Sequence, residues 1–161
     1  MRINEKSIGI RGNVSYVLHD KNGNVKQSGE SENLATDLHE ILVADRLAGG
    51  SDALFTHGHA GTGTGQTESD TNLDSYFDEA RTAVTSSTQG AGADAQKVTV
   101  IYTLGAGVCT GTINEIGIFS SANQATADMK AYSDNGGAGY AIVKGASDTL
   151  TVTWVFTYEA S

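Results

Sequence analysis

The sequence lacks the residues and runs that several large classes of protein require. Its single cysteine, Cys109, cannot form an internal disulfide, which favours synthesis in a reducing cytoplasm. No stretch approaches the length and apolarity of a transmembrane span, and the first residues lack the apolar segment of a signal peptide. We therefore expect a protein that is made in the cytoplasm and has no membrane partner.

Charged residues are also scarce, and they form no run of one sign. They make up 18% of the chain, and 10 basic against 19 acidic residues give a net charge of −9. An acidic surface disfavours nucleic acid as a partner. The apolar fraction of 39% is low, but small residues such as the 20 glycines replace it rather than charge, so disorder of the whole chain is not expected. The length predicts a single domain over residues 1–161.

Strict alternation of side chains marks the last long segment, residues 149–158. Its apolar side chains share one face of a strand: Leu150, Val152, Trp154, Phe156 and Tyr158. One apolar face with a period of two predicts an antiparallel sheet that packs on a core on one side. Further strands are expected at 7–19, 80–86, 97–104 and 112–120, with one that begins at 25–27 and weaker ones at 129–132 and 140–143. Asn22-Gly23 predicts the first hairpin turn.

One helix is expected, over residues 33–48. Leu34, Leu38, Ile41 and Leu42 form its apolar stripe, and Gly49-Gly50 ends it. We expect this stripe, or a facing sheet, to cover Trp154 and its neighbours. The predicted fold class is mainly β, an antiparallel β-sandwich with one packed α-helix.

A Gly/Thr-rich arm is expected at about residues 57–75. Long loops without secondary structure are usually functional or disordered, so we expect this arm to be mobile in the monomer and ordered against a neighbouring chain. The predicted interface residues are Gly61, Thr62, Gly63, Thr64, Gly65, Asp70 and Leu73.

Candidate chemistry is sparse. His57-Gly-His59 is the one metal-like pair, and such a pair from each of three chains would build an octahedral site, but no carboxylate or cysteine nearby completes a site within one chain. Gly61-Thr-Gly-Thr-Gly65 lacks the Gly-Lys-Ser/Thr ending of a phosphate loop. We expect no metal, no cofactor, no catalytic residue and no enzymatic activity.

Several segments together resemble small β-rich virion structural proteins of tailed bacteriophages. The segments are Leu47-Ala-Gly-Gly50, Ala60-Gly-Thr-Gly-Thr-Gly-Gln-Thr67, Asp70-Thr-Asn-Leu73, Arg81-Thr-Ala-Val84, Gly111-Thr-Ile-Asn-Glu-Ile-Gly-Ile-Phe119 and Asp148-Thr-Leu-Thr-Val-Thr-Trp154. The chain departs from the usual pattern in having no proline and in carrying His57-Gly-His-Ala-Gly61 where His-Ile-x-x-Gly is common. The resemblance covers most of the chain and implies a structural role in the virion.

The expected function is therefore a non-enzymatic virion component that binds neighbouring capsid, neck or tail proteins. Virion positions repeat, so a symmetric homo-oligomer is expected, with a trimer favoured. Capsid decoration or a collar role is preferred over tail or tail-fibre attachment, since the chain has no heptad or repeat for a shaft. A carbohydrate-binding receptor module is the rival from another class, with Tyr132, Asp134 and Tyr140 as its candidate group.

Overall fold

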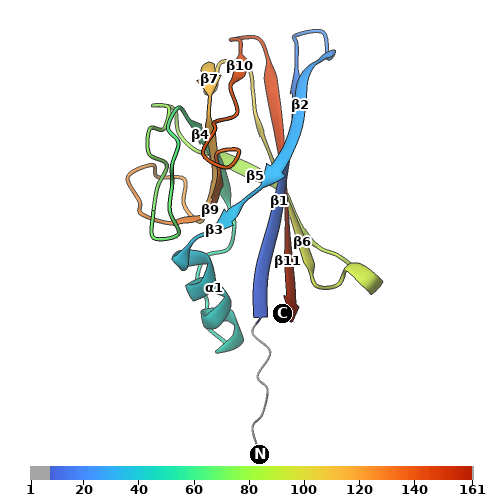
Figure 1. The fold of residues 1–161 in the computed structure, drawn as a ribbon, viewed down its shortest axis with the longest axis vertical. Coiled ribbons are helices and arrows are strands. Elements are labelled where there is room, and N and C mark those ends of the chain that lie inside the picture. The colour runs from blue at the N-terminus through green and yellow to red at the C-terminus, as the bar shows by residue number, and fades with distance from the viewer. Residues whose placement is uncertain (1–7, 161) are drawn as a thin grey trace, which may run out of the picture.

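The computed structural model describes residues 8–160, which form eleven strands and one α-helix (Figure 1). The strands are β1 (Ile8–His19), β2 (Val25–Glu32), β3 (Leu34–Ala35), β4 (His57–Gly61), β5 (Thr82–Gln89), β6 (Lys97–Leu104), β7 (Gly111–Ile113), β8 (Glu115–Phe119), β9 (Met129–Ser133), β10 (Ile142–Lys144) and β11 (Thr149–Ala160). The helix α1 spans Asp37–Leu47, and a 3-10 turn spans Gly92–Asp94. The mainly β, antiparallel class with one packed helix is confirmed.

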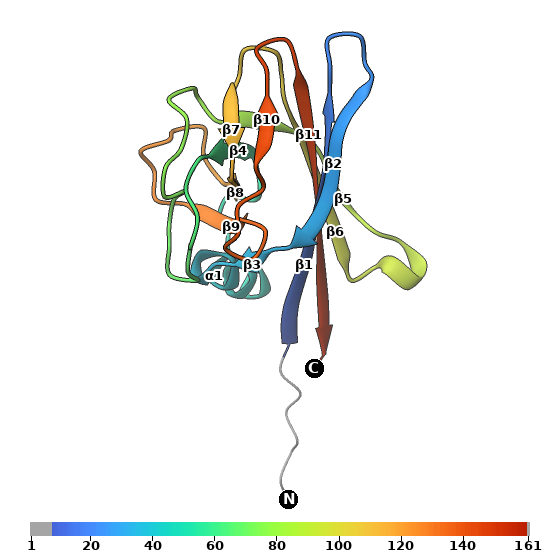
Figure 2. The same cartoon turned by 45° about the horizontal axis from the view of Figure 1, so that its top comes forward.

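The two layers of the predicted sandwich are parts of one curled sheet. Nine strands follow the order β2-β1-β11-β6-β5-β4-β8-β9-β3, and β7 and β10 pair separately. β5 joins the layers, because it pairs with β6 on one side and with β4 on the other. Figure 2 shows β1, β11 and β6 in one layer and β4, β8 and β9 in the opposite one.

Side-chain hydroxyls help to close this sheet into a barrel-like form. β2 runs on into β3, which pairs with β9 through Leu34 and Tyr132. Just before this pairing, the Ser31 Oγ lies 2.8 Å from the Ser133 Oγ, and both contact the Tyr140 hydroxyl. These bonds link the two ends of the sheet where strand pairing is short.

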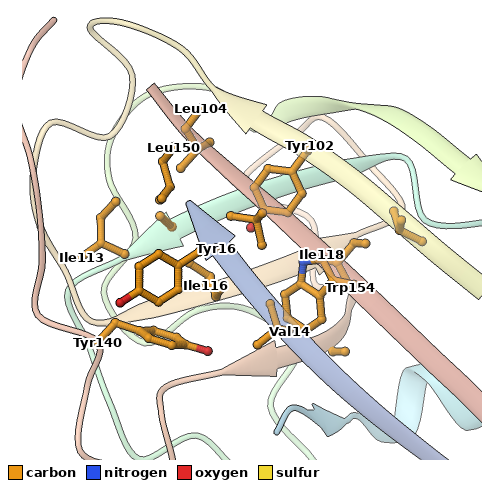
Figure 3. Close-up of a cluster of buried hydrophobic side chains, with 14 of the residues drawn as sticks. Val14, Tyr16, Tyr102, Leu104, Ile113, Ile116, Ile118, Tyr140, Leu150 and Trp154 are labelled. Carbon is orange, nitrogen blue, oxygen red and sulfur yellow. The ribbon is translucent and has the colours of Figure 1, made fainter. Parts of the chain in front are cut away.

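The core lies between the layers. Leu150, Val152, Trp154 and Phe156 are fully buried, as the alternation predicted. Figure 3 shows the side chains of β1 and β11 meeting those of β8, so the facing sheet supplies most of the cover: Val14, Tyr16, Leu150 and Trp154 against Ile116 and Ile118.

A glycine sets the spacing of the layers at one point. A Cβ on Gly58 of β4 would lie 2.2 Å from the ring of Tyr102, a distance that real side chains do not show. The missing side chain lets the Tyr102 hydroxyl donate hydrogen bonds to the carbonyls of His59 at 3.2 Å and Gly117 at 3.3 Å. The buried ring of β6 is thereby held to both β4 and β8.

The helix differs from its prediction in both start and orientation. Leu34 lies in β3, and the Thr36 Oγ1 donates to the Met129 carbonyl at 2.6 Å, so the chain is still bound to the sheet where the helix was expected to begin. α1 buries Leu42, as predicted, together with His39, whereas Ile41 is 54% exposed. The predicted burial of Ile41 is wrong.

Two strand assignments also change. The predicted strand 112–120 divides at Asn114, because β7 pairs with β10 while β8 pairs with β4 and β9. Residues 57–61 were expected in a loop, but they form β4, which pairs along its whole length with β8. The predicted start of the first strand at Ser7 lies outside the described residues.

Candidate interaction surfaces

A buried carboxylate holds the Gly/Thr-rich segment, residues 62–75, against the barrel. Glu115 at the start of β8 has no solvent exposure. Its Oε1 accepts the backbone N–H groups of Gly63 at 3.0 Å and Ser75 at 2.9 Å. Its Oε2 accepts the Gln66 side-chain amide at 2.6 Å and the Asp74 N–H at 3.2 Å. Both ends of the segment are therefore tied to one side chain.

Further bonds fix the middle of the segment. The Gly65 N–H donates to the Asp134 Oδ2 at 2.7 Å, and the Tyr132 hydroxyl donates to the Gln66 carbonyl. The Glu68 carbonyl accepts the Asp37 N–H at 2.9 Å at the start of α1. The segment that we expected to be a mobile arm is thus bonded to the body within one chain.

The predicted interface residues divide into two groups. Gly61 is the last residue of β4 and is buried, and Leu73 is 4% exposed in a small cluster with Phe119, Met129 and Tyr132. These two are part of the core and cannot contact a neighbour directly, which corrects that prediction. The others reach the surface: Thr62, Thr64 and Gly65 are exposed, and Gly63 and Asp70 are partly so. Their role at an interface stays a prediction.

The His57 and His59 pair does not form a shared surface site. His59 is 1% exposed, with its Nε2 2.9 Å from the Phe77 carbonyl and its Nδ1 3.7 Å from the Cys109 Sγ. Both ring nitrogens are engaged inside the chain, and burial lowers the pKa of His59. The His57 Nδ1 lies 2.8 Å from the Thr56 hydroxyl. Within residues 8–160, no group of three or more His, Cys, Asp or Glu is placed to hold a metal ion.

The structure brings Cys109 to His59, a pairing that the sequence did not indicate because 50 residues separate them. Cys109 is fully buried, and burial raises the pKa of its thiol to about 12. A thiol in this state is protonated at neutral pH and acts as a weak hydrogen-bond donor.

A buried ion pair fixes the loop that follows β8. The Arg81 Nη1 lies 2.5 Å from the Asp128 Oδ1, and the two side chains are 1% and 10% exposed. The same guanidinium donates to the carbonyls of Ser121 at 3.1 Å and Thr126 at 3.0 Å, and it stacks on Phe119 at 3.6 Å from the ring centre. Arg81 therefore has a structural role.

The candidate carbohydrate group is inside the protein. Tyr132 and Tyr140 are 5% and 7% exposed, and their hydroxyls bond within the chain. The carboxylate of Asp134 accepts the N–H groups of Gly65 and Gly137. These residues offer no aromatic platform on which a sugar ring could stack.

One surface that the sequence did not reveal is an apolar groove of about 350 Å³ beside α1. Its lining includes Leu42, Leu47, Leu54, Phe55, Val98 and Tyr158. Leu47 is 78% and Leu54 53% exposed. Leu47 and Leu54 lie outside the predicted helix stripe. Their exposure depends on tertiary packing, so the sequence pattern did not indicate this groove.

The comparisons with known proteins add no relative. No family model, no curated protein and no solved structure matches the chain. In the part of the chain that the structure describes, no helix has the length and apolarity needed to cross a membrane.

Proposed function

We propose that this protein is a non-enzymatic structural component of a tailed-phage virion, which binds neighbouring virion proteins as a symmetric oligomer in a capsid-decoration or collar position. The proposal starts from the sequence resemblance. The fixed shape of the Gly/Thr-rich segment is the observation that supports it best.

Burying the Glu115 carboxyl group to hold this segment costs desolvation free energy. A buried carboxylate is expensive unless its oxygens are hydrogen-bonded, and within residues 8–160 the donors to the Glu115 carboxylate all come from residues 63–75. A buried carboxyl side chain thus fixes the shape of one surface segment. A surface that is fixed before binding loses less conformational entropy on association.

The chemistry of the segment also suits a protein partner. It presents the exposed residues Thr62, Thr64 and Gly65 beside the exposed carboxylates of Glu68 and Asp74. Hydroxyl and carboxylate oxygens can accept hydrogen bonds from a neighbouring protein. The acidic surface elsewhere disfavours binding to DNA inside a particle.

Incorporation into particles tests the proposal. A phage that encodes the chain is purified, and the chain is counted by quantitative mass spectrometry. Thr64→Arg should reduce incorporation about tenfold, equivalent to ~1.4 kcal/mol, while the purified variant keeps its melting temperature. Asn22→Arg, at the exposed β1–β2 turn, adds the same charge and should incorporate normally. Absence of the wild-type chain from pure particles would refute the virion assignment.

Tail or tail-fibre attachment remains the second candidate, because the same segment would serve a neighbour at that position equally well. The two positions differ in copy number. Decoration or a collar requires the ring or shell symmetry of the head or neck, whereas fibre attachment requires the lower copy number of the fibres.

A further inference from the structure

The apolar groove beside α1 is open on one side. Its floor consists of buried or half-buried side chains, among them Leu42, Phe55 and Tyr158. Exposed apolar residues flank the floor, with Leu47 at 78% and Leu54 at 53% exposure. Large exposed aliphatic side chains around an apolar hollow are typical of a surface that a partner covers.

Strand β5 forms the open side. It pairs with β4 only through Thr82 and Ala83, and the Val84 N–H donates to the Thr56 carbonyl at 2.8 Å. Beyond Val84, no strand within residues 8–160 pairs with this side of β5, whereas the other side pairs with β6 as far as Gln89. Residues 87–89 line the groove, so the free strand edge and the apolar hollow are adjacent.

The composition of β5 differs from that of β2, the strand at one edge of the nine-stranded sheet. Proteins usually protect a free strand edge from further pairing with charged residues or proline. β2 carries Lys26, Glu30 and Glu32 among its eight residues. β5 is equally long but carries no charged residue and no proline. The unprotected edge is therefore the one beside the groove, which favours the addition of a strand there.

One charged side chain lines the groove, that of the exposed Arg46 in the last turn of α1. Its guanidinium donates to the carbonyls of Gly50 at 3.2 Å and of Asp52, which hold it in place without neutralising its charge. None of the ion pairs among residues 8–160 includes Arg46. The groove thus combines an apolar lining with an unpaired cation, and an apolar segment that carries a carboxylate matches both.

We propose that this groove binds an extended segment of another protein, which adds a strand to β5, buries alternate apolar side chains in the groove and places a carboxylate near Arg46. The free edge at residues 85–89 is about 17 Å long, which is room for about five residues of an added strand. The inference goes beyond the proposed function, because α1 and β5 lie outside residues 62–75 and form a separate contact surface.

Synthetic peptides test the proposal, with binding to the purified full-length protein measured by fluorescence anisotropy. The probe is a peptide of about seven residues with blocked ends, which alternates valine and threonine and has an aspartate at each end. The control peptide has lysine in place of aspartate. The aspartate peptide should bind about fivefold more tightly than the lysine peptide, and Arg46→Gln should remove this preference.

Two matched substitutions on α1 locate the site. Leu47→Asp places a carboxylate in the apolar contact and should weaken binding of the aspartate peptide about tenfold or more. Ile41→Asp adds the same charge at a 54% exposed position that does not line the groove, and it should bind the peptide like wild type. Both positions are exposed, so both variants should fold.

Hydrogen exchange shows whether the peptide is bound as a strand. An added strand pairs with backbone groups on the free edge of β5, so amide exchange in residues 85–89 should slow when the wild-type protein is saturated with the aspartate peptide. A peptide that occupied the groove through its side chains alone would leave exchange in these residues unchanged.

Four results would each overturn the proposal: no binding of the aspartate peptide to wild type, equal binding of the two peptides, equal loss in Leu47→Asp and Ile41→Asp, or unchanged exchange in residues 85–89. Sedimentation of the protein alone is a further check. Self-association that Leu47→Asp abolishes and Ile41→Asp retains would assign the groove to a second copy and would also overturn it. None of these outcomes depends on whether the chain enters virions, so the proposed function is tested separately.

Discussion

The Glu115 carboxylate accepts the backbone N–H of Gly63 at 3.0 Å, across 52 residues of sequence. Glu115 opens β8 inside the sheet, and Gly63 follows directly after β4 and Thr62. A Cβ on Gly63 would lie 2.8 Å from the Glu115 Oε1, so the close approach also depends on glycine at this position. The bond joins the core to the segment on which the proposed function rests.

Glu115→Gln should destabilise the protein and loosen residues 62–75. The substitution replaces one acceptor oxygen with an amide NH2 group that faces N–H donors, which leaves buried donors without partners. A loss of about 2–4 kcal/mol in the free energy of unfolding is expected. Urea unfolding measures this loss, and hydrogen exchange should become faster in residues 63–75 first.

Glu68→Gln is the matched control, because Glu68 belongs to the same segment but is exposed. Its effect should stay within about 0.5 kcal/mol. Equal effects of the two substitutions would show that the Glu115 bonds do not hold the segment.

Arg81→Met should cost about 3–5 kcal/mol of unfolding free energy, because it leaves the buried Asp128 carboxylate without its cation. Arg81→Lys should recover only part of this loss, since a single ammonium nitrogen lacks the planar fork in which Nη1 bonds Asp128 and Ser121 while Nη2 bonds Thr126. Thermal and urea unfolding provide the measurement. Arg11→Lys is the control, as the Arg11 side chain is 81% exposed and its pair with Glu159 should contribute less than about 1 kcal/mol.

His39 should make stability fall in mild acid. Burial chiefly, with the nearby Lys130 cation, lowers the pKa of His39 to about 4, against 6.5 for an ordinary histidine. The unfolded chain therefore takes up the proton first as pH falls. The contribution of His39 is complete above about pH 6.5, declines as pH falls towards 4, and amounts to about 3 kcal/mol.

Urea midpoints measured between pH 7.5 and 3.5 check this expectation. His39→Leu should flatten the profile over the interval, although the lowered pKa of His59 contributes a residual slope of the same sign. An unchanged slope in His39→Leu would mean that the imidazole is not neutral in the folded protein.

Trp154 is the single tryptophan and is fully buried, stacked on Phe156 with ring centres 5.9 Å apart. Its fluorescence should be blue-shifted and protected from acrylamide. Trp154→Ala should cost about 3–5 kcal/mol. Trp154→Phe should cost less than half of that, because among residues 8–160 the indole Nε1 has no hydrogen-bond partner to lose. Water-like emission from the folded protein would contradict the packing.

The sequence predicted what depends on local pattern and missed what depends on distant contacts. Alternation located β11 and its buried face, and Asn22-Gly23 located the first turn, where Gly23 has a φ of 85°. β4 was missed because His57-Gly-His-Ala-Gly61 has no apolar alternation, and its pairing with β8 and the Tyr102 ring above Gly58 supply its stability instead. The helix stripe failed at Ile41 because β3 takes Leu34 into the sheet.

At the candidate surface, too, the sequence indicated the local composition but not the contacts between distant residues. Glycine and threonine composition drew attention to residues 57–75, but composition could not reveal that Glu115 and Asp134 supply acceptors from 50 and more residues away. Nor could it separate exposed Thr64 from buried Leu73, since that difference arises from packing against Phe119 and Met129.

An electron-microscopy map of an intact particle of a phage that encodes the chain tests the central claim most directly. We predict density for this fold at symmetry-related positions on the head or neck, with the segment held by Glu115 against a neighbouring virion protein. A particle map without this fold, or one in which residues 62–75 face solvent in every copy, would contradict the account.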